Sequence, residues 1–145
     1  MRRTGSRQRY IAALLALIVI SVAGCSLLGD TVDCASPNFH GYRITPPPSA
    51  SNVQESCSNG INPTYRASFT MAAGDLVAFQ QSTFVKDIPN WQTTAPSKSQ
   101  FSQEAAQAKS LLYGTFGDGA ILEEILIDTS HAQQYKVYVV LSNVD

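Results

Sequence analysis

The sequence predicts an α+β fold in which an antiparallel sheet of about five strands carries one or two helices on one face, in the order β-β-α-(α)-β-β-β. Three observations lead to this fold. Residues 65–71 alternate between apolar and polar side chains, which is typical of a strand with one buried face. Residues 72–84 change to helical spacing. The C-terminal third contains apolar, β-branched stretches separated by turn signals.

The entry to the domain contains a run of prolines at residues 46–48. Such a run favours a stiff polyproline segment, although Pro48 also suits the first position of one helical turn over residues 49–52. A short strand is expected next, over residues 53–57. The Ser-Asn-Gly sequence at residues 58–60 is a turn signal that leads into the alternating strand.

Two helices are expected between the first strands and the C-terminal strands. The first runs from about residue 73 to residue 82, because Leu76 and Phe79 share a face at helical spacing. Asp75 lies in its first turn, where the helix dipole favours an acid. A second, shorter helix is expected over residues 102–109.

The C-terminal part of the chain is predicted to be a meander of three strands. These strands cover residues 110–116, 120–128 and 134–142, and Gly-Asp-Gly at residues 117–119 is a hairpin signal between the first two. The last strand is apolar on both faces, so we expect it in the centre of the sheet.

The N-terminus has the three parts of a secretory signal. Residues 1–9 carry four arginines and no acid, residues 10–24 are apolar, and small residues close the run. The run is shorter than the roughly 20 residues that span a bilayer comfortably. An uncleaved membrane helix is the alternative, because apolar residues continue nearly to Leu28.

Residues 22–25, Val-Ala-Gly-Cys, resemble the lipobox of bacterial lipoproteins, in which an aliphatic residue and two small residues precede a cysteine. The resemblance implies that the Cys25 sulfur receives a diacylglyceryl group and that cleavage before Cys25 makes it the new N-terminus. Two acyl chains hold a protein stably on a membrane without a spanning helix. We therefore expect a lipid-anchored protein on the extracytoplasmic face of the cell membrane.

This processing divides the chain into a signal peptide (residues 1–24), a lipidated N-terminus and tether (residues 25–45) and a single α+β domain (residues 46–145). Cleavage removes four arginines and no acid, which leaves six basic and eleven acidic residues and a net charge near −5. Such an acidic domain has no electrostatic footprint for nucleic acid, so nucleic acid is excluded as a partner.

Cys34 and Cys57 are the cysteines that the lipid would leave unmodified. Export places them in a compartment where disulfides persist, so the lipobox resemblance implies a Cys34–Cys57 disulfide as the single remaining pairing. Free thiols and a zinc site are the alternatives, but neither a C-x-x-C spacing nor a nearby histidine pair supports zinc. We expect no metal and no cofactor.

Residues that usually carry catalysis are sparse in this sequence. The histidines are His40, in the tether, and His131, in a turn between strands, and neither has an obvious partner. Glu123 and Glu124 are neighbours on a strand, so they point to opposite faces; one is expected to be solvated and the other to lie at a sheet edge. Asp118 between two glycines is interpreted as a turn residue rather than a calcium ligand. No catalytic residue is assigned.

Trp91 is the candidate binding residue, because it lies in a loop rich in Thr, Pro and Ser, and tryptophan is enriched among interface hot spots. Core packing is the alternative role, with Ile88 and Trp91 folding back onto the domain. The leading hypothesis is a non-enzymatic binding module of the bacterial cell envelope. It would contact an envelope protein, a peptide or a cell-wall ligand through its sheet face or residues 85–100. The alternatives are a small hydrolase or lyase with an unrecognised site and an accessory subunit of a transporter or sensor.

The mature domain also resembles small uncharacterised bacterial lipoproteins. The resemblance rests on the Pro-Ser-Ala-Ser-Asn entry at residues 48–52, the strand that reaches Phe69, and the Asp-Leu-x-x-Phe pattern from Asp75 to Phe79. It implies the same general architecture and carries no assigned activity.

Overall fold

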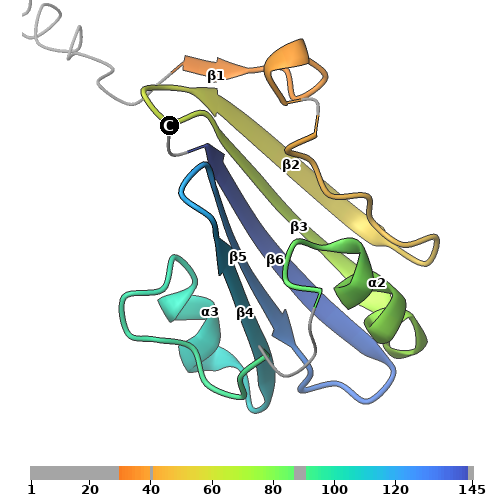
Figure 1. The fold of residues 1–145 in the computed structure, drawn as a ribbon. Helices are drawn as coiled ribbons and strands as arrows, with labels where there is room; N and C mark the ends of the chain where they lie inside the picture. The colour runs from red at the N-terminus through yellow and green to blue at the C-terminus, as the bar shows by residue number, and fades with distance from the viewer. Residues whose placement is uncertain (1–29, 40, 87–90, 144–145) are drawn as a thin grey trace, which may run out of the picture.

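The computed structural model describes residues 30–39, 41–86 and 91–143, which form one antiparallel sheet with the strand order β1-β2-β3-β6-β5-β4 (Figure 1). No helix among these residues is long and apolar enough to cross a membrane. The strands are β1 (Asp30–Val32), β2 (Ser51–Asn59), β3 (Thr64–Ala72), β4 (Leu111–Gly117), β5 (Ile121–Asp128) and β6 (Gln134–Asn143); the helical segments are η2 (Pro37–Phe39), η3 (Ala73–Asp75), α2 (Leu76–Ser82) and α3 (Ser102–Gln107).

The centre of the sheet is the pair formed by β3 and β6. Their register runs from Thr64 opposite Ser142 to Ala72 opposite Gln134, and β5 pairs with the other side of β6. A strand with a neighbour on each side and a layer on each face favours apolar residues in both directions. The predicted central position of the last strand, the C-terminal meander and the alternating strand at β3 are therefore confirmed.

The sheet has six strands rather than the predicted five, because β1 forms within residues that the sequence assigned to the tether. β1 contains three residues and pairs only with the end of β2, from Asp30 opposite Asn59 to Val32 opposite Cys57. Three residues are too few to show a two-residue period, so no local pattern predicts this strand.

The predicted boundaries at the start of the domain also change. The helical turn considered over residues 49–52 does not form. A single hydrogen-bonded turn lies earlier in the chain, where the Ala50 N–H donates to the Pro47 carbonyl at 2.9 Å. β2 then begins at Ser51, earlier than predicted. The register shifts between Ser51 and Gln54, and Asn52 has a φ of 53° at this irregularity. A bulge of this kind bends the strand and allows it to start directly after the proline run.

The main core lies on one face of the sheet, which we call the main face. Phe79 of α2 meets Phe69 of β3 edge to face, with ring centroids 5.5 Å apart. Such an aromatic pair adds to the stabilisation that its buried area provides. The buried members of the main core come from β2, β3, β5 and β6, from η2 and α2, and from the segment between η2 and β2: Phe39, Ile44, Cys57, Tyr65, Ala67, Phe69, Met71, Phe79, Ile125, Ile127, Val137, Val139 and Leu141.

A second, smaller core lies on the opposite face, over β4, β5 and β6. Phe101, Tyr113, Leu126 and Val140 are buried there, and Ala105 of α3 packs against them. The prediction that both helices lie on one face is therefore wrong, because α2 belongs to the main core and α3 to the second core. The reason is that β5 and β6 bear apolar side chains in both directions, which requires a covering layer on each face.

Candidate functional site

Glu123 is fully buried on the main face and fastens the chain that follows α2 to the sheet. Its Oε2 atom accepts hydrogen bonds from the backbone N–H groups of Phe84 and Val85, at 2.8 and 3.2 Å. Its Oε1 atom has no hydrogen-bond partner among the described residues. Burial raises the pKa of Glu123 to about 7, against the two backbone donors, which lower it.

Glu124 performs the same task on the opposite face. Its Oε1 atom accepts hydrogen bonds from the Ser99 hydroxyl and from the Gln100 N–H, the latter at 2.8 Å. Only 8 % of the residue is exposed. Burial raises the pKa of the neighbouring Tyr113 to about 12, and the charge of Glu124 adds to this effect. Glu124 thus holds the segment before α3 on the second core.

These positions correct the expectation that one glutamate is solvated and the other lies at a sheet edge. The two side chains do point to opposite faces, as neighbours on a strand must. Each is buried because a loop crosses the sheet above it and supplies backbone N–H groups that would otherwise lack an acceptor. The two carboxylates therefore do not form a catalytic pair.

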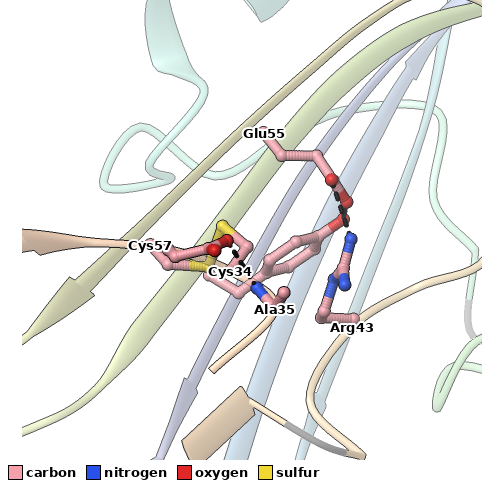
Figure 2. Close-up of polar contacts among 7 residues, drawn as sticks. Cys34, Ala35, Arg43, Glu55 and Cys57 are labelled. Atoms are coloured by element: carbon pink, nitrogen blue, oxygen red, sulfur yellow. Dashed lines mark hydrogen bonds and ion pairs between the residues drawn. A yellow bond between two sulfur atoms is a disulfide. The ribbon is translucent and has the colours of Figure 1, made fainter. Parts of the chain in front are cut away.

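A third carboxylate, Glu55 of β2, connects the N-terminal segment to the sheet. Its Oε2 accepts a hydrogen bond from Arg43 at 2.8 Å, and its Oε1 accepts one from the Tyr65 hydroxyl at 2.7 Å. Figure 2 shows Arg43 reaching from the N-terminal segment toward Glu55. Burial of the phenol and its bond to Glu55 both raise the pKa of Tyr65. Both oxygens of Glu55 have a structural partner.

The Cys34–Cys57 disulfide is present beside this cluster (Figure 2). The Cα atoms are 5.2 Å apart, within the range that a disulfide allows. Cys57 is buried in the main core, and the bond joins β2 to the turn that follows β1. The predicted pairing is confirmed, and the free-thiol and zinc alternatives are wrong. Among the described residues, no group of His, Cys, Asp and Glu side chains is arranged to hold a metal ion.

Trp91 is partly buried and packs against the main core. Its indole N–H donates to the Val85 carbonyl at 3.0 Å. The ring lies so close to Gly114 of β4 that a Cβ atom there would be 3.2 Å from two ring carbons. Trp91 therefore has the packing role that was the alternative to binding. A role of Trp91 in binding stays a prediction. Ile88 lies outside the described residues.

His131 is exposed in the turn between β5 and β6, as expected, and lines an open hollow of about 580 Å³ with Thr70 and Lys136. A histidine that acts as a general base usually has a carboxylate or carbonyl that orients its ring. The His131 ring makes no hydrogen bond to the described residues, and none of the residues lining this hollow is acidic. His40, the other histidine, lies outside the described residues.

One half of the second face carries no helix, and we call it the open face. It consists of the outward side chains of β2, β3 and β6 beside α3, and most of them are polar: Gln54, Ser56, Thr64, Arg66, Ser68, Thr70, Lys136, Tyr138 and Ser142. In the register, Thr64, Ser68 and Thr70 of β3 lie opposite Ser142, Tyr138 and Lys136 of β6. From Thr64 to Thr70, every second residue of β3 therefore presents a hydroxyl or a guanidinium on this side.

Three hollows follow β3 along the open face. One of about 240 Å³ lies over Thr64 and Ser142, the next of about 320 Å³ lies over Ser68 and Tyr138, and the third is the one beside His131. Arg66 borders the first two, so they are adjacent. Their lining combines hydrogen-bonding side chains of β3 and β6 with apolar side chains, among them Phe101, Leu122 and Val140.

The two cations of the open face are held by neighbours. The Arg66 guanidinium donates to the Gln100 amide oxygen at 3.0 Å, which connects β3 to the segment before α3. The Lys136 ammonium lies 5.0 Å from the centre of the Tyr138 ring, within cation–π distance. These contacts orient both charged groups above the sheet, where they remain exposed.

Fold and geometry together define a disulfide-linked antiparallel sheet with a short helix on each face and one polar, uncovered half-face. Comparison of the chain with protein families, curated proteins and solved structures finds no match. The sequence did not predict the open face, because it depends on where α3 ends relative to β3. The polar side of the alternating β3 residues was the available signal.

Proposed function

We propose that this chain is a lipid-anchored protein on the extracytoplasmic face of a bacterial membrane. Support comes from the basic and then apolar N-terminus and from the lipobox-like residues that end in Cys25. The Cys34–Cys57 disulfide agrees with export, because disulfides persist in oxidising compartments outside the cytoplasm.

We further propose that the domain binds an extended polar component of the cell wall along the open face. The observation that carries this proposal is the row of hollows along β3, which offers a hydroxyl or guanidinium at every second residue from Thr64 to Thr70. Hydrogen-bonding groups repeated along a strand suit a chain-like ligand with repeated polar groups. Glu55, Glu123 and Glu124 each attach a loop or segment to the sheet, which favours binding over hydrolysis as the function of the domain.

Cys25→Ser tests the anchor. We expect the variant to leave the membrane fraction or to keep its signal peptide, because the lipid has lost its attachment atom. The measurement is fractionation of cells followed by the mass of the protein in each fraction. Cys57→Ser is the matched control, since it removes a cysteine without removing the anchor, and it should stay in the membrane fraction. A Cys25→Ser protein that is processed and still sediments with membranes would refute the lipidation.

Photo-crosslinking tests the open face. A photoreactive amino acid is placed at Ser56 on the open face and, in a control protein, at Gln81 on α2, which is exposed elsewhere on the domain. Intact cells are irradiated and their cell wall is then purified. We expect the protein with the probe at Ser56 to be attached to the cell wall and the protein with the probe at Gln81 to be absent from it. Equal yields at both sites, or a product that contains only another protein, would contradict cell-wall binding by the open face.

A further inference from the structure

Several segments meet at one end of the sheet, which we call the tether end. β1 begins there, since Asp30 pairs with Asn59 just before the turn between β2 and β3. β6 ends beside the same turn, where the Asn143 N–H donates to the Pro63 carbonyl at 3.0 Å. The β4–β5 hairpin lies there as well, because Ile121 pairs with Asn143. Figure 1 shows the start of β1, the β2–β3 turn and the end of β6 together at this end.

The tether end presents two exposed large apolar side chains. Ile61, in the β2–β3 turn, is 97 % exposed, the highest value among the large apolar residues that the structure describes. Leu122 of β5 is 41 % exposed and lines the same hollow as Asn62, the residue after Ile61. A fully exposed isoleucine at the tip of a turn contributes nothing to the core, so its apolar surface is available to a partner.

The length of the chain before β1 places a lipid anchor close to these residues. Four residues, 26–29, separate Cys25 from Asp30, so the two Cα atoms are at most about 18 Å apart. β1 runs antiparallel to β2, and its first residue is the one nearest the β2–β3 turn. Ile61 follows the strand partner of Asp30, Asn59, by two residues, so the turn that carries it begins beside the start of β1. The turn is therefore within reach of the surface that holds the lipid.

We propose that the tether end faces the bilayer and that Ile61 inserts into the membrane interface as a second, hydrophobic contact. This inference rests on the proposed lipidation of Cys25, and it adds a fixed orientation of the domain. The open face would then stand upright from the membrane, because β3 runs away from the tether end. Asp30 and Asp118 are also exposed at this end, so the contact depends on apolar burial rather than on anionic lipid headgroups.

The test uses the full lipidated protein in vesicles with an environment-sensitive fluorescent amino acid at residue 61. A control protein carries the same probe at Val77 of α2, which is 52 % exposed and follows the other end of β3. We expect a blue-shifted emission at residue 61, together with quenching by lipids that carry a nitroxide near the headgroup. We expect aqueous emission at residue 77. The shift at residue 61 should be the same in phosphatidylcholine vesicles and in vesicles that also contain phosphatidylglycerol.

Aqueous emission at residue 61 while the protein floats with the vesicles would overturn this orientation and leave the lipid anchor intact. Failure of both proteins to float would refute the anchor itself, and the orientation with it. The same probe at residue 61 in a Cys25→Ser protein should report water in the absence of vesicles. A blue shift in that sample would show that residue 61 is covered by protein, which also overturns the proposal.

Discussion

In the Glu123→Gln variant, the domain should no longer lose the part of its free energy of unfolding that the wild type loses as the pH rises. Glu123 is fully buried, and its pKa of about 7 lies well above the ordinary value of 4.5 because burial disfavours the charged form. Between these two values the folded chain keeps a proton that the unfolded chain has lost. The contribution of Glu123 to the free energy of unfolding therefore falls as the pH rises from about 4.5 to about 7.

The size of this effect follows from the shift in pKa. The difference between 4.5 and about 7 corresponds to a loss on the order of 3 kcal/mol across that interval. Glutamine stays neutral and keeps an oxygen that can accept the bonds from Phe84 and Val85. The stability of Glu123→Gln relative to the wild type should therefore increase with pH over this interval and level off above it.

Urea unfolding of both proteins at a series of pH values measures this difference, and Glu123→Ala serves as the comparison. Alanine leaves the two backbone N–H groups of Phe84 and Val85 without their acceptor, at about 1–3 kcal/mol for each unsatisfied group. We expect the free energy of unfolding of Glu123→Ala to be lower than that of Glu123→Gln at every pH. The wild type and Glu123→Gln are compared by the difference between their free energies of unfolding. If this difference does not change between pH 4.5 and 7, the Glu123 carboxyl titrates as an ordinary glutamate.

Loss of the Cys34–Cys57 disulfide should destabilise the domain by about 3 kcal/mol, because the bond closes a loop between residues 23 positions apart. β1 is held to the rest of the sheet by three residue pairs, so the segment before η2 should lose most of its order when the bond is absent. Replacing both cysteines with alanine avoids a buried hydroxyl at Cys57. The free energy of unfolding and the amide hydrogen exchange of residues 30–39 measure the two effects.

Cys25→Ala is the matched control for the disulfide variant, since it leaves the bond in place and should unfold like the wild type in detergent. Protection of the amides in β3 and β6 should persist in the double-alanine protein, because these strands lie at the centre of the sheet. A double-alanine protein that loses less than about 1 kcal/mol would contradict the expected cost of opening the loop.

The strands with a clear two-residue period could be predicted from the sequence. β3 alternates over its length, and the hairpin between β4 and β5 has glycines on both sides of Asp118. Asp118 closes that turn by accepting hydrogen bonds from the N–H groups of Ala120 and Ile121. Both features depend on neighbours in the chain, which explains why local pattern was sufficient.

The features that the sequence did not predict depend on contacts between distant residues. β1 has three residues and exists because β2 offers it an edge and Cys57 a covalent link. Of Glu123 and Glu124, one was expected to be solvated and the other to lie at a sheet edge. Both are buried by loops that lie earlier in the chain: 38 and 39 positions before Glu123, and 24 and 25 positions before Glu124. A charged residue on a strand gives no local sign that a distant backbone will cross it.

The candidate site was predictable only in part for the same reason. The N-terminal pattern and the number of cysteines predicted the pairing of Cys34 with Cys57, and the structure contains that disulfide, while the role of Cys25 stays a prediction. The open face depends on α3 covering β4, β5 and β6 and leaving β2 and β3 uncovered. That placement is decided by the packing of Phe101 and Ala105, which no short motif encodes.

The intact mass and the N-terminal peptide of the protein, purified from the membranes of its own source, test the lipid anchor most directly. We predict a chain that begins at Cys25, carries a diacylglyceryl group on the sulfur of that residue and holds Cys34 and Cys57 in a disulfide. A chain that still contains residues 1–24, or a Cys25 with an unmodified thiol, would contradict both the anchor and the orientation that follows from it.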